Sequence, residues 1–161
     1  MFSTCEVLFV KTHPDAKLPT RGHEDVENDI TGLGTNIEGT GDTGYDITAV
    51  AEVTIPAKGS AVVPTGITVG YITPGFWWKV ESRSGLSFKH SVLAHPGIID
   101  NQYRGDTGVK LYNFSDKDHV VVKGDRVAQL VVYPLIAPEI GWTEQALETD
   151  RGSSGFGSTG Q

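Results

Sequence analysis

Short runs of β-forming residues recur along this chain between closely spaced glycines and prolines, which leaves little room for other regular structure. With 20 glycines and 8 prolines among 161 residues, long helices would be interrupted repeatedly. The runs between the breakers are rich in valine, isoleucine, threonine and aromatic residues, as strands are. They are Glu6–Lys11, Ala51–Ile55, Ser60–Val63, Ile67–Ile72, Phe76–Ser82, Val109–Phe114, His119–Val122 and Val127–Tyr133. This pattern predicts one all-β domain with a sandwich, jelly-roll or barrel-like fold.

Charge and cysteine content exclude several classes of protein. A net charge of −7 argues against direct, non-specific binding of nucleic acid. The single cysteine, Cys5, excludes a disulfide framework and a cysteine-rich zinc site. The first residues do not resemble a signal peptide, and no apolar run approaches the ~18 residues of a membrane-spanning helix. We therefore expect a cytoplasmic protein that does not bind membranes.

An acidic, glycine-rich segment at about residues 23–43 departs from the strand pattern. From Gly22 to Gly44 there are six glycines and six carboxylates, and no lysine or arginine. The apolar residues within it step at helical spacing, at Val26, Ile30, Leu33 and Ile37. Because Gly32 and Gly34 weaken a helix, we expect a solvated loop with at most two helical turns. Such a loop could also bind a protein partner.

The C-terminal sequence RGSSGFGSTGQ also departs from the pattern. Glycine and serine dominate it, which alone predicts a flexible end. One arginine, Arg151, and one aromatic residue, Phe156, stand within this otherwise small-residue segment.

Arginines cluster with glycine and with hydroxyl or carboxylate residues, which favours a polyphosphate site. Four of the five arginines have this setting: Arg83, Arg104, Arg126 and Arg151. A guanidinium group matches phosphate geometry, and nearby glycines let backbone N–H groups approach an anion. The chain has no P-loop, dinucleotide-binding fingerprint, HExxH motif or GxSxG elbow, so the familiar motifs do not account for such a site.

Five segments in order resemble those of the trimeric dUTP pyrophosphatases (dUTPases). They are TGYDITA at 43–49, SRSGLS at 82–87, GIIDNQYRGD at 97–106, GDRVAQLV at 124–131 and RGSSGFGSTG at 151–160. The segment HPDAKLPTRG at 13–22 also resembles the usual opening of the family. Any one segment alone would be weak support, but together they span nearly the whole chain.

The resemblance implies a distorted β jelly roll that assembles as a homotrimer with active sites shared between subunits. Residues 1–150 would form the β domain, and residues 151–161 an arm that closes over the site. The implied reaction converts dUTP and water to dUMP and pyrophosphate with Mg²⁺. It limits uracil incorporation into DNA and supplies dUMP for thymidylate synthesis.

The family's catalytic and phosphate-binding roles map onto specific residues. The resemblance makes Asp100 the base that deprotonates the attacking water, and Gln129 the amide that helps to hold this water. It places Asp46 near Mg²⁺ through coordinated water, and Arg83, Ser84 and Gly85 on the phosphates. From the residues alone, Asp46 could instead belong to a turn, and Gln129 could be an inward polar strand residue. Asp125 and Arg126 are interpreted mainly as an ion pair in a turn.

The resemblance also assigns recognition of the nucleoside and closure of the arm. Tyr103 would lie under the deoxyribose and leave no room for a 2′-hydroxyl, although a packed aromatic residue is the alternative. Main-chain groups of a tight hairpin would read the uracil, at Ala94, Gly97, Ile98, Ile99 and Gly108. The arm would contribute Arg151 to the γ-phosphate, Phe156 to the uracil, and Gly157, Ser158 and Thr159 to the phosphates.

The sequence departs from the family pattern in three places. The acidic stretch before the GYD motif is longer than usual. Glu81 and Ser82 precede Arg83 where the family commonly has a small residue and proline, with Trp77 and Trp78 just upstream. Gln102 replaces a frequent aspartate. The alternatives are a related dCTP deaminase, a family member with a regulatory protein-binding role, and a generic β-sandwich binding module.

Overall fold

The computed structural model describes residues 4–26 and 39–155. Within these residues it contains eleven strands and one short helix, and all strand pairs are antiparallel. The elements are β1 (Val7–Lys11), β2 (Tyr45–Thr48), β3 (Val53–Ile55), β4 (Ser60–Val63), β5 (Ile67–Ile72), β6 (Phe76–Glu81), α1 (Ser84–His90), β7 (Val92–Ala94), β8 (Gly97–Ile99), β9 (Val109–Asn113), β10 (His119–Val121) and β11 (Arg126–Pro134). The predicted all-β class is confirmed.

All eight predicted runs are strands, with ends that differ by one or two residues at most. The sequence did not reveal β2, β7, β8 or α1. The helix escapes notice because none of its side chains is buried, and its aromatic residue Phe88 is 91% exposed. It therefore lacks the apolar stripe by which a helix is recognised. The helical spacing from Val26 onward falls mainly on residues 27–38, outside the described residues.

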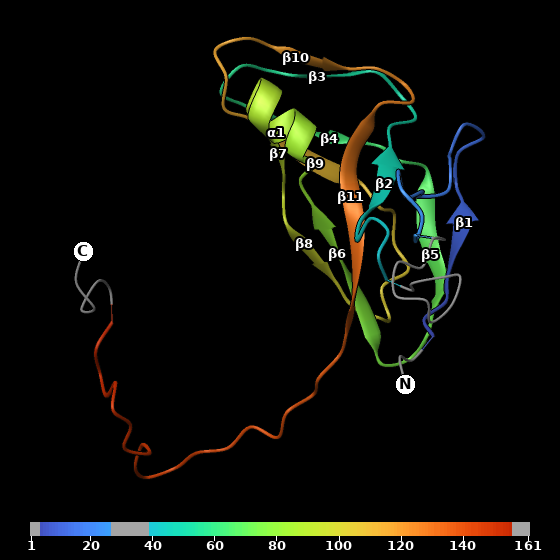
Figure 1. Cartoon of the computed structure of the whole chain (residues 1–161). Coiled ribbons are helices and arrows are strands. Elements are labelled where there is room, and N and C mark those ends of the chain that lie inside the picture. Colours follow the sequence, from blue (N-terminus) through green and yellow to red (C-terminus); the bar gives the residue numbers. More distant parts are fainter. Residues whose placement is uncertain (1–3, 27–38, 156–161) are drawn as a thin grey trace.

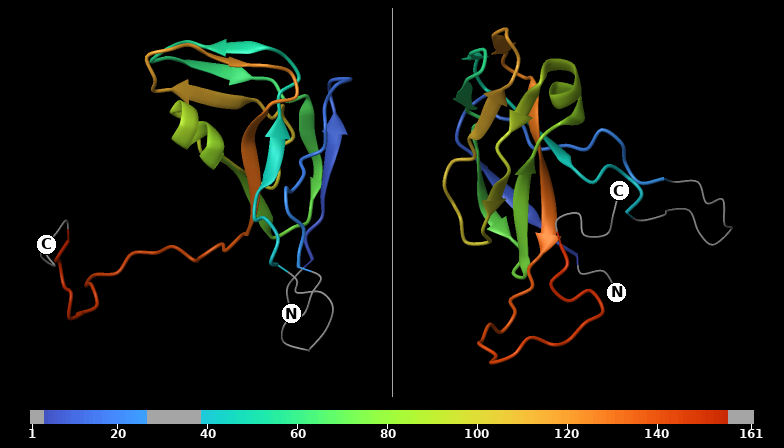
Figure 2. Two further views of the ribbon diagram at one scale, coloured as in Figure 1. Left: turned by 45° about the horizontal axis from the view of Figure 1, so that its top comes forward. Right: turned by 90° about the vertical axis from the view of Figure 1, so that its left-hand side faces the viewer.

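Strands far apart in the sequence pair with one another (Figures 1 and 2). A four-stranded sheet has the order β2-β11-β6-β8, and a three-stranded sheet has the order β4-β9-β7. The remaining pairs are β1 with β5 and β10 with β3. The chain thus crosses repeatedly between sheets, as in a jelly roll. This arrangement confirms the expected distorted jelly-roll fold.

Successive side chains along each strand of the four-stranded sheet point to opposite faces, so the sheet has an inner and an outer face. On β6, Trp78 and Val80 are buried, whereas Lys79 and Glu81 point to the other side and form an ion pair of 2.5 Å. The inner side chains join those of the other sheets in one hydrophobic core, which includes Ile47, Ile55, Val63, Val69, Leu111, Val121 and Leu130. The outer face is therefore left for polar residues.

Beyond Pro134 the chain leaves the body of the molecule (Figures 1 and 2). Residues 135–155 contain no strand or helix. Their large apolar side chains are exposed in one chain, including Ile136, Ile140, Trp142 and Leu147. No helix in the described part of the chain is long and apolar enough to cross a membrane.

Candidate active site

Three polar side chains form a row on the outer face of the four-stranded sheet. Gln129 on β11 lies opposite Asp46 on β2 and opposite Glu81 on β6. The residue next to each of them along its strand is buried in the core, so these three side chains point away from it. The fold thereby places a carboxylate and an amide from sequence-distant segments on neighbouring strands.

Asp46 is held between two guanidinium groups. Nε of Arg83 donates to its Oδ1 at 2.7 Å, and Nη1 of Arg126 lies 3.4 Å from its Oδ2. The Asp46 side chain is only 16% exposed, so this pair is better shielded from solvent than most surface ion pairs. Arg126 is thus part of this cluster, and its expected ion pair with Asp125 is wrong. Asp125 instead accepts from the backbone N–H of Val122 at 2.9 Å.

The SRSG segment marks the transition from β6 to α1. Arg83 is the residue before the helix, and Ser84 and Gly85 are its first two residues. The hydroxyl of Ser87 donates back to the carbonyls of Arg83 and Ser84, which fixes this first turn. A Cβ at Gly85 would meet nothing within 4 Å. The backbone beside Arg83 is therefore open to an approaching ligand.

One hydrogen bond and the close packing of Gly44 position the side chain of Gln129. Its Nε2 donates to the carbonyl of Ser82 at 2.9 Å, which leaves Oε1 as an acceptor. A Cβ at Gly44 would collide with the Gln129 side chain. Glycine at 44 is thus required by packing against the amide. Sequence reasoning missed this role, although the position lies within the TGYDITA segment.

These residues line one polar pocket of about 320 Å³. Its lining is Gly22, His23, Asp42, Thr43, Gly44, Asp46, Arg83, Ser84, Arg126 and Gln129. Four predicted site residues are therefore brought together, namely Asp46, Arg83, Ser84 and Gln129. Sequence reasoning missed His23 and Asp42, which flank the acidic segment and carry no signal of their own.

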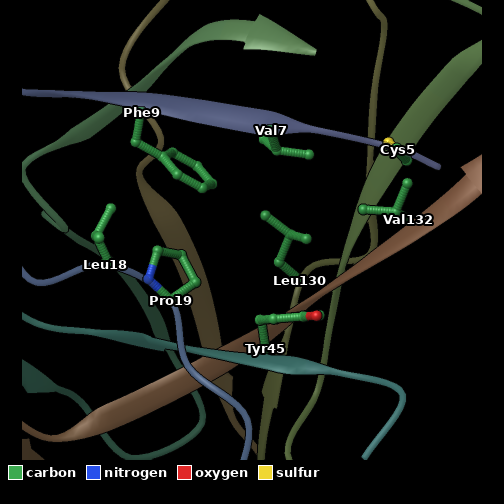
Figure 3. A pocket seen from close by; sticks show the side chains of 8 residues that line it. All are labelled: Cys5, Val7, Phe9, Leu18, Pro19, Tyr45, Leu130 and Val132. Carbon is green, nitrogen blue, oxygen red and sulfur yellow. The ribbon is translucent and has the colours of Figure 1, made fainter. Parts of the chain in front are cut away.

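A second hollow of about 340 Å³ is lined mainly by apolar side chains (Figure 3). Side chains around β1 face residues of β2 and β11 across it, and its lining is Cys5, Val7, Phe9, Leu18, Pro19, Tyr45, Leu130 and Val132. Burial raises the pKa of the Cys5 thiol. Because this hollow offers no cation and no carboxylate, it does not suit a phosphorylated ligand.

The two ends of the acidic segment form a neck at the rim of the polar pocket. Backbone hydrogen bonds join Thr20 to Asp46 and His23 to Asp42. The N–H groups of Gly41 and then Gly39 hold the pKa of Asp25 below its usual value, because they donate to its carboxylate. The pKa of Asp42 is also lowered, chiefly by its hydrogen bond with the His23 ring. Residues 27–38 lie outside the described residues.

The segment that carries the predicted base follows edge strand β8. Ile98 lies opposite Lys79, so it belongs to the outer face, and it is 68% exposed. Asp100 directly follows the strand, and its carbonyl accepts from the N–H of Tyr103 at 3.0 Å. The side chain of Asn101 donates to the carbonyls of Thr73 and Phe76, which anchors this turn.

The ends of the expected hairpin around Ala94–Gly108 are paired, because β7 runs antiparallel to β9 with Ala94 opposite Leu111, but a long loop that contains β8 lies between them, so the hairpin is not tight. Strand β8 pairs with β6, whereas β9 pairs with β4 and β7. The residues between them form a loop, because the two strands belong to different sheets. In this loop the Tyr103 hydroxyl donates to the carbonyl of Asp106 at 3.0 Å. A Cβ at Gly105 would collide with the Tyr103 ring, which explains glycine in the YRG sequence.

Ser82 connects the phosphate segment to β7. Its hydroxyl accepts from the N–H of Ala94 at 2.9 Å. The serine that departs from the family pattern is therefore a structural link to a predicted site residue. Gly97 and Ile99 lie on β8, and Gly108 lies just before β9.

Asp100 lies far from the polar pocket within one chain. On β6, Glu81 lies opposite Gln129, and Trp78 lies opposite Ile99. Asp100 is therefore level with Trp77, four residues from Glu81, or about 13 Å along the strand. One chain alone does not bring the predicted base to the predicted amide.

The arm also lies apart from the pocket. The Nε of Arg151 donates to the carbonyl of Ser154 at 2.9 Å, a contact within the arm itself. Figure 1 shows this segment away from the sheets. Phe156, Gly157, Ser158 and Thr159 lie outside the described residues.

The residues of the pocket fit Mg²⁺ only if phosphate oxygens of a nucleotide and water complete its coordination. Within residues 4–26 and 39–155, no three His, Cys, Asp or Glu side chains could hold a metal ion between them. Mg²⁺ in nucleotide enzymes usually keeps several waters and takes one or two carboxylates plus phosphate oxygens. The single carboxylate of Asp46, next to cations that suit phosphate, matches that requirement.

Comparisons with known proteins agree with the fold and with the motifs. The dUTPase family model matches residues 35–160. The deoxyuridine 5′-triphosphate nucleotidohydrolase of Oryza sativa subsp. japonica is 46% identical over 117 residues, which are 73% of this chain and 68% of that protein. The enzyme of that name from Paramecium bursaria Chlorella virus 1 is 39% identical over 120 residues, 74% of this chain and 84% of the relative.

Solved structures extend the likeness to nearly the whole chain. A dUTPase mutant of Staphylococcus bacteriophage 80alpha with dUpNHpp has a TM-score of 0.74 at 27% identity, and covers 97% of this chain and 99% of that one. A mutant dUTPase from phage phi11 of S. aureus, described with a structural Mg(II) ion, shares the fold with a TM-score of 0.70 at 24% identity, and covers 91% of this chain and 100% of that one. On the family model and the relatives together, this chain belongs to the dUTPase family.

Proposed function

We propose that this chain hydrolyses dUTP to dUMP and pyrophosphate, at a site that copies of the chain build together. The observation that carries the proposal is the polar pocket that gathers Asp46, Arg83, Ser84 and Gln129. The reaction would limit uracil incorporation into DNA and supply dUMP for thymidylate synthesis. We further propose that the protein acts in the cytoplasm.

The phosphate chain binds at the start of α1. Arg83 presents a guanidinium already oriented by Asp46 at 2.7 Å, which reduces the entropy lost when it binds phosphate. The hydroxyl of Ser84 and the open backbone at Gly85 complete this contact. The Ser84 hydroxyl lies near the α–β bridging oxygen, where charge develops as pyrophosphate departs.

Mg²⁺ would be held by the phosphate oxygens and, through coordinated water, by Asp46. It supplies neutralisation of the phosphate charge when it is bound. The Asp46 carboxylate also has to keep Arg83 in place, so it serves both the metal and the guanidinium.

Attack on the α-phosphorus requires a base and a second contact to the water. Asp100 takes a proton from water as the water oxygen bonds to the α-phosphorus, and the bond to the α–β bridging oxygen breaks. Pyrophosphate leaves with that oxygen. Oε1 of Gln129 accepts a hydrogen bond from the other O–H of the water, because Nε2 already donates to the carbonyl of Ser82.

A homotrimer accounts for the distance between Asp100 and Gln129. The outer face of one copy would meet the β8 segment of another, which supplies the base. In this arrangement Ala94, Gly97, Ile98, Ile99 and Gly108 read the uracil through main-chain groups. Tyr103 lies under the deoxyribose and excludes a 2′-hydroxyl, and the close backbone excludes a 5-methyl group.

The arm closes over the bound nucleotide. Arg151 contacts the γ-phosphate and Phe156 stacks on the uracil, while Gly157, Ser158 and Thr159 surround the phosphates. Aromatic stacking contributes ~1–3 kcal/mol per base and a charge-assisted arginine contact ~1.5–3 kcal/mol, and these gains offset an ordering cost of about 1–2 kcal/mol for each backbone residue of the arm. The arm is therefore expected to close only when nucleotide is present.

Pyrophosphate release tests this function directly. With Mg²⁺, the protein should release pyrophosphate from dUTP and much less from dCTP, dTTP or UTP. Ammonia release from dCTP would instead support the related deaminase. No release of pyrophosphate from dUTP would overturn the proposed function.

A further inference from the structure

The neck of the acidic segment contributes two side chains to the polar pocket. His23 comes just before the acidic segment leaves the described residues, and Asp42 lies just after it returns. Both line the pocket with Arg83, Ser84 and Gln129. The mechanism above uses neither of them.

The His23 ring has a fixed orientation. Its Nδ1 lies 3.1 and 3.2 Å from the two carboxylate oxygens of Asp42, and the His23 backbone N–H also donates to Asp42 Oδ2 at 3.1 Å. With Nδ1–H donating to the carboxylate, Nε2 is the ring nitrogen left for another ligand. The His23 side chain is 86% exposed, so the ring is accessible at the pocket rim.

Other contacts than the His23–Asp42 pair hold the two sides of the neck together. Asp25 already accepts from the N–H groups of Gly39 and Gly41 at 3.1 and 2.7 Å, and it pairs with Arg21 at 3.2 Å. The N–H of Val26 donates to the hydroxyl of Thr40 at 2.8 Å. These contacts join the two sides of the neck beyond His23 and Asp42.

Two guanidinium groups share the pocket with the His23 ring. Arg83 and Arg126 line the same pocket, and Asp46, which lies between them, is engaged by both. Asp42 is engaged by His23 itself, while Arg21 beside the neck pairs with Glu24 and Asp25. The carboxylates of Asp46 and Asp42 thus already accept hydrogen bonds from these groups. The remaining N–H groups of the two arginines and of the His23 ring can donate to a polyanion in the pocket.

We propose that His23, oriented by Asp42, is an additional phosphate-binding residue of this dUTPase, supplied by the neck of its acidic segment. This inference rests on the proposed function for the identity of the nucleotide. The protonated ring donates from Nε2–H to an oxygen of the phosphate chain, and Asp42 acts as a positioning residue.

Binding of ligands with and without phosphates tests the proposal. Calorimetry with dUpNHpp, inorganic pyrophosphate and deoxyuridine would compare the full-length wild type with the H23A, H23Q and D42N variants. H23A should weaken dUpNHpp and pyrophosphate roughly 5- to 20-fold and leave deoxyuridine unchanged. It should raise the KM for dUTP with kcat within about twofold. H23Q, which keeps a neutral donor, should recover part of the affinity, and D42N should weaken the same ligands by a smaller factor.

Controls separate a binding role from a structural one. Glu24 belongs to the same neck but does not line the pocket, so E24Q should bind all three ligands as the wild type does.

Unchanged pyrophosphate and dUpNHpp affinity in folded H23A and H23Q would overturn the inference, and wild-type hydrolysis of dUTP would leave the proposed function intact. An equal loss for deoxyuridine would also overturn it, because that result indicates a structural role. A wild type that does not hydrolyse dUTP would overturn the proposed function, and the pyrophosphate measurement would still decide the role of His23.

Discussion

At the scale of single residues, the site depends on small side chains as much as on charged ones. Gly44 is needed because Gln129 occupies the space of any larger residue, and Gly105 because the Tyr103 ring does. Both glycines stand within segments by which the family is recognised. Their reason for being glycine is packing against a site residue rather than backbone conformation.

The substitution G44A should disturb the site without unfolding the protein. The added methyl displaces the end of the flexible Gln129 side chain and breaks its hydrogen bond to Ser82. We expect turnover of dUTP to fall roughly 10-fold or more, because the water loses an aligned contact, with little change in Tm. G141A is a matched control, since nothing lies within 4 Å of a Cβ at that position. Wild-type turnover in G44A would exclude Gln129 from the mechanism.

The substitution D100N removes the proton acceptor and preserves the shape of the side chain. Turnover should fall roughly 10²- to 10⁴-fold, the usual contribution of a general base, while dUpNHpp still binds. Steady-state kinetics and calorimetry on the same preparation would measure both quantities. A D100N enzyme with near wild-type kcat would show that another group accepts the proton.

At the scale of elements, pairing between distant segments decides what the sequence could and could not predict. Runs such as Ile67–Ile72 and Phe76–Glu81 alternate or cluster apolar residues strongly enough to be found from sequence. Strand β2 was missed because it carries Asp46 and tyrosine with little apolar pattern. Strands β7 and β8 have three residues each and flank His95 and Pro96, so they give no periodic signal.

The sequence motifs predicted which residues form the site better than they predicted how these residues contact one another. Asp46, Arg83, Ser84 and Gln129 were expected together and line one pocket. The roles of His23 and Asp42 could not be predicted, because a long acidic segment separates them in sequence. The partner of Arg126 was mispredicted for a similar reason: the register of β11 against β2 places it near Asp46, 80 positions away.

The partly buried His119 on β10 makes stability depend on pH. The His90 and His119 rings lie 5.0 Å apart. The pKa of His119 is lowered, first by burial and then by the nearby His90. The unfolded chain therefore binds a proton at His119 more readily than the folded chain does. This residue lowers the stability of the fold below the ordinary histidine pKa, and the penalty disappears as pH rises above it.

The H119Q variant should reduce the acid sensitivity of the fold. Its Tm should fall less between pH 7.5 and pH 5.5 than the Tm of the wild type, because the unfavourable protonation is removed. Thermal unfolding followed by circular dichroism at both pH values gives the comparison. H13Q removes a histidine from another part of the molecule and serves as a control. An identical pH dependence in H119Q and the wild type would show that protonation of His119 does not destabilise the fold.

At the scale of the whole molecule, the last strand completes the folded core, whereas the segment after it lies outside the core. Strand β11 ends at Pro134, and among residues 132–155 none is fully buried in the core. The exposed apolar side chains of residues 135–155, such as Trp142, are consistent with a segment that contacts another copy. The fold and the arm should therefore be separable by truncation.

Truncation after Asp150 should leave the domain folded and reduce turnover. It removes Arg151 and Phe156, so we expect kcat for dUTP to fall by about 10²-fold, because phosphate contacts and exclusion of water are lost together. Thermal unfolding and pyrophosphate release measure the two effects, and removal of Gln161 alone is the control. Full activity after truncation would show that the arm has no catalytic role.

Subunit mixing tests most directly the central claim that Asp100 of one copy serves the Gln129 pocket of another. D100N and Q129A proteins, each nearly inactive alone, would be unfolded together, refolded as mixtures and assayed for pyrophosphate release from dUTP. Random assembly should restore about a quarter of the wild-type sites, because each site then draws its two residues from different copies. Activity no greater than the sum of the two separate variants would contradict the shared site.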